Sequence, residues 1–152
     1  MLDREGNEKD TVYYGKLKSI NNAVLHSGDN LTGEGDGDDE LITINLSKIP
    51  DYIDSIWPVV TIYTSGKNFS QVKGTYCRIF EGRSSEFCKY MLYHNNDGVS
   101  NGNIVGNFKR SGGGWTFKAL GYYTKGTKTP RDITHIVKEV RNNNFARVKV
   151  VD

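Results

Sequence analysis

The sequence predicts a mainly β protein: a β-sandwich of short antiparallel strands with one short helix and a C-terminal amphipathic helix. Three observations favour this class. Seventeen glycines supply tight turns, nine tyrosines and six phenylalanines favour strands, and apolar and polar residues alternate in several short runs. A length of 152 residues corresponds to about one ordinary domain. We therefore expect residues 1–152 to form a single domain.

Alternating runs at 11–17, 41–46 and 115–123 predict half-buried strands. Residues 75–80, 87–94 and 103–108 are predicted to supply further strands, separated by clusters of turn residues. In the run at 115–123, Trp115, Phe117 and Ala119 share one face. Residues 56–63 are apolar almost throughout, which is typical of a strand buried on both faces, with Pro58 confined to its start.

Two segments are predicted to be helical. The first, 47–55, is long enough for only a turn or two. The second, 129–142, has Thr129 as its candidate N-cap and Pro130 at the first helical position. Its apolar residues recur at the spacing of an amphipathic helix. They are Ile133, Ile136, Val137 and Val140. Such a stripe usually packs against a core.

An acidic, glycine-rich segment at 28–40 is the most unusual part of the sequence. It holds six carboxylates, four glycines and no basic residue. The remaining residues carry 20 basic and 12 acidic side chains, so the net charge of the chain is only +2. Neighbouring carboxylates repel each other by about 1 kcal/mol per pair even at 4 Å in bulk water. Either a bound cation or an open, solvated loop relieves that repulsion.

Calcium is the cation that suits this composition. It takes six to eight oxygen ligands, supplied by carboxylates, amide oxygens and backbone carbonyls, and glycines let the backbone turn sharply between them. Counted as twelve positions from Asp29, the segment does not match an EF-hand. Leu31, Gly33 and Glu34 stand where that motif needs acid, acid and glycine. Composition alone favours a calcium loop and a solvated loop equally, whereas the negative charge excludes phosphate binding.

Three stretches carry a resemblance to a known family. They are VYYGKLKSINNAVLHSGDNLTGEGDGDDELITINLSKIPDYIDSIWPVVTIY at 12–63, FSQVKGTYCRIF at 69–80 and GGGWTFKALGYY at 112–123. Together they are similar to the TerD family of tellurite-resistance and general stress proteins, and HSGDNLTGEGDGDDE at 26–40 is the most specific element. The resemblance implies a β-sandwich, calcium binding through the acidic segment and a role in bacterial stress response. It implies no known reaction.

Carried over by position, the resemblance assigns the metal ligands to the acidic segment. The side chains are Asp29, Asn30, Asp36, Asp38, Asp39 and Glu40. Backbone oxygens around Gly35 and Gly37 complete the set, and the implied cofactor is Ca2+. Leu31 is expected to pack, while Thr32 either binds the ion or braces the turn.

The sequence departs from the family at both ends. Family members begin well before the position of Met1, with strands that end in an acidic DLD-like motif. We therefore expect a TerD-like domain without those N-terminal strands, which leaves the number of calcium ions open. At the other end, residues 109–149 hold ten lysines and arginines against two acids, Asp132 and Glu139. Because clustered positive charge attracts phosphate groups, an alternative function is a basic module that binds nucleic acid or an anionic membrane surface.

Other classes of protein have little support in the sequence. The polar N-terminal stretch has no apolar core of a signal peptide, and no run reaches the roughly 18 apolar residues of a membrane span, so we expect a cytoplasmic protein. No nucleophile, base and orienting group occur together, so we expect no enzyme. The three histidines show no metal-ligand spacing and receive no role. Calcium and other stress-response or tellurium-resistance proteins are the expected partners.

Two cysteines, Cys77 and Cys88, are expected to be reduced thiols. A less favoured alternative is a disulfide. A two-residue turn at Gly82 and Arg83 would place the two cysteines directly opposite each other on a hairpin, within bridging distance.

Overall fold

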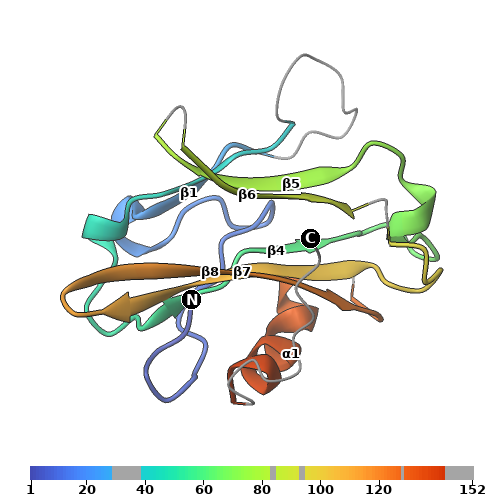
Figure 1. Cartoon of the computed structure of the whole chain (residues 1–152). Helices are drawn as coiled ribbons and strands as arrows, with labels where there is room; N and C mark the ends of the chain where they lie inside the picture. Colours follow the sequence, from blue (N-terminus) through green and yellow to red (C-terminus); the bar gives the residue numbers. More distant parts are fainter. Residues whose placement is uncertain (29–38, 83–84, 93–94, 128, 143–152) are drawn as a thin grey trace. The chain divides into compact units, whose positions relative to one another are not determined.

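A computed structural model of the chain describes residues 1–28, 39–82, 85–92, 95–127 and 129–142. The chain divides into two compact units, residues 1–55 and 56–152. Among the described residues, strands form antiparallel sheets, and the α-helix α1 (Pro130–Asn142) follows the last strand (Figure 1). The predicted class, mainly β with a C-terminal helix, is confirmed. The expectation of a single domain stays a prediction.

The first unit is built around a small hairpin. Strand β1 (Val24–His26) pairs antiparallel with β2 (Ile42–Ile44). Two short 3₁₀ helices flank it, η1 (Ile20–Asn22) and η2 (Leu46–Lys48). The buried apolar residues of this unit are Leu2, Ala23, Val24, Ile49 and Ile53. The predicted short helix at 47–55 is thus reduced to one 3₁₀ turn that begins at Leu46.

Residues 11–17, predicted to be a strand, form a tight turn instead. The backbone N–H groups of Tyr13 and Lys16 donate to each other's carbonyl oxygens, at 3.0 and 2.9 Å. A Cβ atom at Gly15 would lie 2.7 Å from the Tyr13 ring, so a larger residue there would displace the Tyr13 side chain. Burial along 11–17 does not alternate either, since residues 11–13 are half-buried and residues 14–17 are exposed.

The second unit contains two antiparallel sheets. In the larger sheet, β7 (Gly102–Ser111) pairs with β8 (Gly114–Thr124) along nearly its whole length. β8 occupies one edge of β7. β3 (Ser55–Ile56) and β4 (Val59–Thr61) pair with the opposite edge of β7. The smaller sheet consists of β5 (Tyr76–Glu81) and β6 (Ser85–Met91). A 3₁₀ helix, η3 (Phe69–Gln71), precedes β5.

The two sheets of the second unit pack face to face around a shared core. Its buried centre is formed by Phe69, Tyr90, Leu92 and Val105, and Val60, Ile62, Cys77, Ile79, Cys88, Ala119 and Tyr123 pack against it. Helix α1 covers the opposite face of the larger sheet, where a Cβ atom at Gly102 would lie 3.4 Å from Ile133 Cδ1 (Figure 1). Taken alone, this unit is a small β-sandwich with one helix.

The apolar run 56–63 is not one buried strand, contrary to the prediction. β3 ends at Ile56 and β4 begins at Val59, and all three residues of β4 are only half-buried. Pro58 has no N–H group for a ladder, although its carbonyl oxygen accepts a hydrogen bond from Val105 N at 2.9 Å. Proline therefore divides the run into two short strands.

Helix α1 matches the predicted segment 129–142. Ile133, Val137 and Val140 are buried, as the apolar spacing indicated. At its start, the backbone N–H of Thr129 donates to Asp132 Oδ2 at 2.8 Å, and the Asp132 N–H donates to the Thr129 carbonyl at 3.0 Å. A carboxylate in the first turn also interacts favourably with the helix dipole. No helix in the described part of the chain is long and apolar enough to span a membrane.

Cys77 and Cys88 lie on the hairpin of β5 and β6, and neither forms a disulfide. The predicted register is wrong: Cys77 lies opposite Tyr90, and Cys88 lies opposite Ile79. Glu81 lies opposite Ser85, which already shifts the pairing by one residue relative to a two-residue turn, and a β-bulge between Ile79 and Phe80 shifts it by one more. The two cysteines are therefore diagonal neighbours on one face of the sheet.

Candidate metal site at the β1–β2 hairpin

The acidic segment 28–40 joins β1 to β2. His26, the last residue of β1, lies opposite Ile42, the first residue of β2. Beyond the strands, Ser27 N donates to the Leu41 carbonyl at 2.8 Å, and Leu41 N donates to Ser27 Oγ at 2.9 Å. The hairpin thus holds both ends of the acidic segment side by side.

His26 connects the two ends of that loop. Its Nδ1 atom accepts a hydrogen bond from Gly28 N at 2.9 Å, so in the neutral ring the proton is on Nε2. Nε2 lies 3.7 Å from Glu40 Oε2. The His26 side chain is 5% exposed, whereas that of Glu40 is 41% exposed. The His26 ring is therefore buried next to Glu40, whose carboxylate is accessible to solvent.

Two of the six predicted ligands, Asp39 and Glu40, belong to the described residues, and both are exposed. The others, Asp29, Asn30, Asp36 and Asp38, lie outside them. No three His, Cys, Asp or Glu side chains of the described residues are grouped to hold a metal. The described part of the segment still fits calcium chemically, because it offers accessible carboxylate oxygens next to the hydrogen-bonded pair Ser27 and Leu41. The full ligand set stays a prediction.

The sequence alone indicated no role for His26, although the structure places its ring next to both Gly28 and Glu40. His26 and Glu40 are fourteen positions apart, and their contact depends on the pairing of His26 with Ile42. A hairpin register is set by the turn and the pairing of its strands, which the sequence around His26 does not specify. The alternating run 41–46 was the available signal, since it predicted the second strand of the hairpin.

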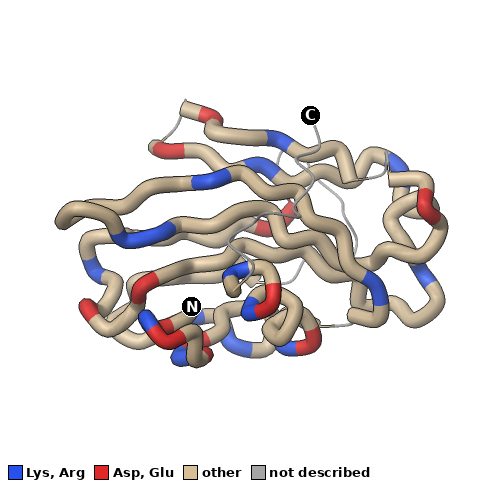
Figure 2. Tube along the Cα trace, turned by 60° about the horizontal axis from the view of Figure 1, so that its bottom comes forward, with Lys and Arg blue, Asp and Glu red and all other residues tan. Residues whose placement is uncertain are grey.

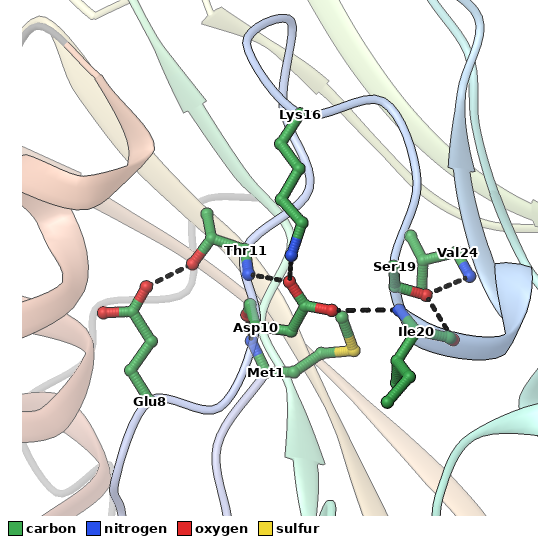
Figure 3. Close-up of polar contacts among 8 residues, drawn as sticks. All are labelled: Met1, Glu8, Asp10, Thr11, Lys16, Ser19, Ile20 and Val24. Atoms are coloured by element: carbon green, nitrogen blue, oxygen red, sulfur yellow. Dashed lines mark hydrogen bonds and ion pairs between the residues drawn. The ribbon is translucent and has the colours of Figure 1, made fainter.

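A second polar cluster of the first unit surrounds Asp10 (Figure 3). The Asp10 carboxylate accepts hydrogen bonds from the Lys16 ammonium group, from Thr11 N at 2.9 Å and from Ile20 N at 3.1 Å. Burial alone would raise the pKa of Asp10, but the bonds from Lys16 and Ile20 and the charge of Lys16 outweigh it and lower the pKa. Because these donors surround the carboxylate, we interpret the cluster as structural.

Basic residues of the segment 109–149 are distributed over β7, β8 and α1. Those within the described residues are Lys109, Arg110, Lys118, Lys125, Arg131, Lys138 and Arg141. Lys109 lies opposite Thr116, and Lys118 lies opposite Asn107, so the two lysines share one face of the hairpin. The Arg110 guanidinium lies 4.4 Å from the centre of the Trp115 ring. Along the strands in Figure 2, lysines and arginines occur as separate positions.

Comparison with known proteins identifies the family. A family model described as the TerD domain matches residues 1–130. The chain belongs to the TerD family. The match includes the β1–β2 hairpin and its acidic loop, and it ends at Pro130, the first residue of α1.

Curated relatives of this TerD chain have related names. Tellurium resistance protein TerZ of Serratia marcescens is 38% identical over 126 residues, 83% of this chain and 64% of that protein. General stress protein 16U of Bacillus subtilis (strain 168) is 38% identical over 80% of this chain and 66% of its own length. Chemical-damaging agent resistance protein B of Clostridium acetobutylicum is 40% identical over 76% of this chain and 85% of its own length. The chain spans less than two thirds of the first two proteins.

Proposed function

We propose that this TerD chain is a calcium-binding stress-response protein that holds the ion in its acidic loop, residues 28–40. The observation that carries the proposal is the β1–β2 hairpin, which joins the ends of a loop with six carboxylates and no basic residue. Calcium, when bound, supplies the positive charge that offsets the repulsion among these carboxylates. The names of the relatives, which refer to stress and tellurium resistance, support the biological setting.

Each described residue near the loop has a distinct part in this proposal. Asp39 and Glu40 provide exposed carboxylate oxygens, and the buried His26 ring lies next to Glu40. The remaining ligands are Asp29, Asn30, Asp36 and Asp38. We further propose that the protein acts in the cytoplasm by binding and without catalysis, together with other stress-response proteins, because its sequence groups no nucleophile, base and orienting residue.

Thermal unfolding in chelator, magnesium and calcium tests the proposal. An ion held by the folded loop binds the unfolded chain far less well, so calcium raises the free energy of unfolding. The gain is about 2.7 kcal/mol when free calcium is a hundredfold above its Kd. Magnesium is expected to stabilise less, because it demands a tight octahedral shell and loses water reluctantly. Identical melting curves in chelator and millimolar calcium, with a flat calorimetric titration, would refute the proposal.

Substitutions distinguish a metal site from a solvated acidic loop. Asp36→Asn, Asp38→Asn and Glu40→Gln each remove one charge and keep an oxygen. They are expected to weaken calcium binding and to raise the melting temperature in chelator, because repulsion falls. Asp51→Asn is the matched control, since Asp51 is exposed in the same unit but outside the loop. If the loop is only solvated, the variants would raise the melting temperature in chelator, and there would be no calcium binding for them to weaken.

A second candidate function rests on the excess of positive charge between 109 and 149. The described part of that segment holds seven basic residues against Asp132 and Glu139, and Lys109 and Lys118 are exposed on one hairpin face. This charge favours weak binding of nucleic acid or an anionic membrane surface.

A further inference from the structure

We propose that Cys77 and Cys88 together bind one thiophilic metal ion that accepts two sulfur ligands. Both cysteines lie in the second unit, whereas the acidic loop belongs to the first. The proposal therefore does not rest on calcium binding, and either one can fail alone.

The register of β5 and β6 places the two thiols on one face. Cys88 lies directly opposite Ile79, which is two residues from Cys77 on the same strand, and residues two apart on a strand share a face. Both cysteines pack against the buried core between the two sheets of the second unit. Both are half-buried, so an ion from solvent can reach them.

The diagonal spacing suits an ion better than a disulfide. Diagonal neighbours across an antiparallel pair are about 7–8 Å apart, with somewhat less between their Cβ atoms. A disulfide needs Cβ atoms about 3.5–4.5 Å apart. A bridging ion replaces one sulfur–sulfur bond of about 2 Å with two metal–sulfur bonds of about 2.3 Å each. It therefore spans the wider gap without moving the strands.

Binding of an ion to the pair needs no oxidant or reductant. A divalent ion breaks two S–H bonds, forms two metal–sulfur bonds and releases two protons to solvent, with no change in oxidation state. Two thiolates and a divalent ion have no net charge, so half-burial costs little.

The surroundings select the class of ion. No third His, Cys, Asp or Glu of the described residues joins the two cysteines in a metal-holding group. Structural zinc is almost always four-coordinate, so a pair of thiols fits it poorly. A soft ion that is satisfied by two thiolates, such as mercury(II), fits the pair.

The test is a titration of the reduced, full chain with mercury(II) chloride, monitored by proton release and by remaining free thiols. We expect one ion per chain, two protons released per ion, and both thiols lost together. X-ray absorption should find two sulfur neighbours around the metal. Zinc should compete poorly. Binding of two ions per chain, one at each thiol, would overturn the proposal, as would zinc binding of comparable strength.

Single substitutions test whether the two thiols act jointly. Cys77→Ser and Cys88→Ser are each expected to weaken mercury(II) binding by about 10²- to 10⁴-fold, measured by competition with a small monothiol, because the second bond is no longer intramolecular. Met91→Leu is the matched control: it removes another sulfur of β6, opposite Tyr76, and should change nothing. Alanine variants repeat the test if a serine variant unfolds. Retention of affinity within about threefold in either single variant would contradict joint binding.

Discussion

Asp10 illustrates how one carboxylate organises a segment of irregular chain. Its side chain is 8% exposed and accepts hydrogen bonds from Lys16, Thr11 and Ile20. The pKa of Asp10 is lowered from the ordinary value of 3.8. Its stabilising effect is therefore fully present above 3.8 and is lost as the pH falls through the lower, folded-state pKa.

We expect Asp10→Asn to lower the free energy of unfolding by about 1–3 kcal/mol at pH 7, since charge-assisted hydrogen bonds are lost. The difference between parent and variant should begin to shrink below pH 3.8, because Asp10 of the unfolded parent then binds a proton, and it should shrink further as the pH falls through the folded-state pKa. Urea unfolding at both pH values measures it, with the exposed Asp51→Asn as the control. A difference that is equal at pH 7 and pH 3 would mean that charge is not the source.

The acidic residues of the candidate site could be recognised from the sequence, but their support could not. Composition indicated oxygen ligands, since carboxylates and glycines dominate residues 28–40. The contacts of Ser27 and His26 depend on the register of the hairpin, which places His26 opposite Ile42. Local sequence carries little information about such pairing, because it is decided across the fold.

Strand β8 contains a β-bulge that depends on a single glycine. Ile104 pairs with Tyr122 and Gly106 pairs with Ala119, so β8 has one more residue than β7 in this interval. Gly121 has a φ of 63°, and a Cβ atom there would lie 2.7 Å from Tyr90 Cε1. Both the backbone conformation and the approach of β6 therefore require glycine.

We expect Gly121→Ala to destabilise the protein by about 1–3 kcal/mol or more, from backbone strain and from displacement of Tyr90. Gly112→Ala is the matched control. Gly112 also has a positive φ, of 54°, but a Cβ atom there would have no neighbour within 4 Å. Denaturant unfolding should show a clearly larger loss for Gly121→Ala. Equal losses would indicate that the packing of Tyr90 contributes nothing.

Elements were predictable from sequence where the pattern was long and had a clear boundary. α1 combined a four-residue apolar stripe with Thr129 and Pro130 at its start, and it begins at Pro130. The strands predicted at 11–17 and 56–63 are not formed as predicted, for local reasons. The chain turns between Tyr13 and Lys16, and Pro58 has no N–H group to donate to a ladder. Alternation shows which residues suit a strand, but a strand also needs an uninterrupted partner.

On the scale of the whole molecule, charge is divided between an acidic loop and a basic C-terminal segment. The chain carries only +2 overall, yet residues 109–149 hold ten basic residues and two acids. We expect weak binding to generic DNA or anionic vesicles that decreases steeply with salt, because each phosphate contact releases counterions.

Retention on immobilised DNA and on anionic vesicles at low and high salt measures this binding. Lys109→Gln with Lys118→Gln, which removes two charges from one hairpin face, should reduce it. Lys48→Gln in the first unit is the control, since Lys48 is exposed and lies outside the basic segment. Retention that does not change between low and high salt would argue for specific contacts and against a diffuse electrostatic surface.

The pairing at the two ends of the acidic segment also affects how this segment can change in evolution. Pairing of His26 with Ile42 and the hydrogen bonds between Ser27 and Leu41 are made outside the intervening residues. Insertions or deletions between those anchors leave the faces of both strands unchanged, and doubling the length of such a loop costs only about 0.6 kcal/mol in closure entropy. The number and spacing of the carboxylates can therefore change in evolution while the paired strands stay the same.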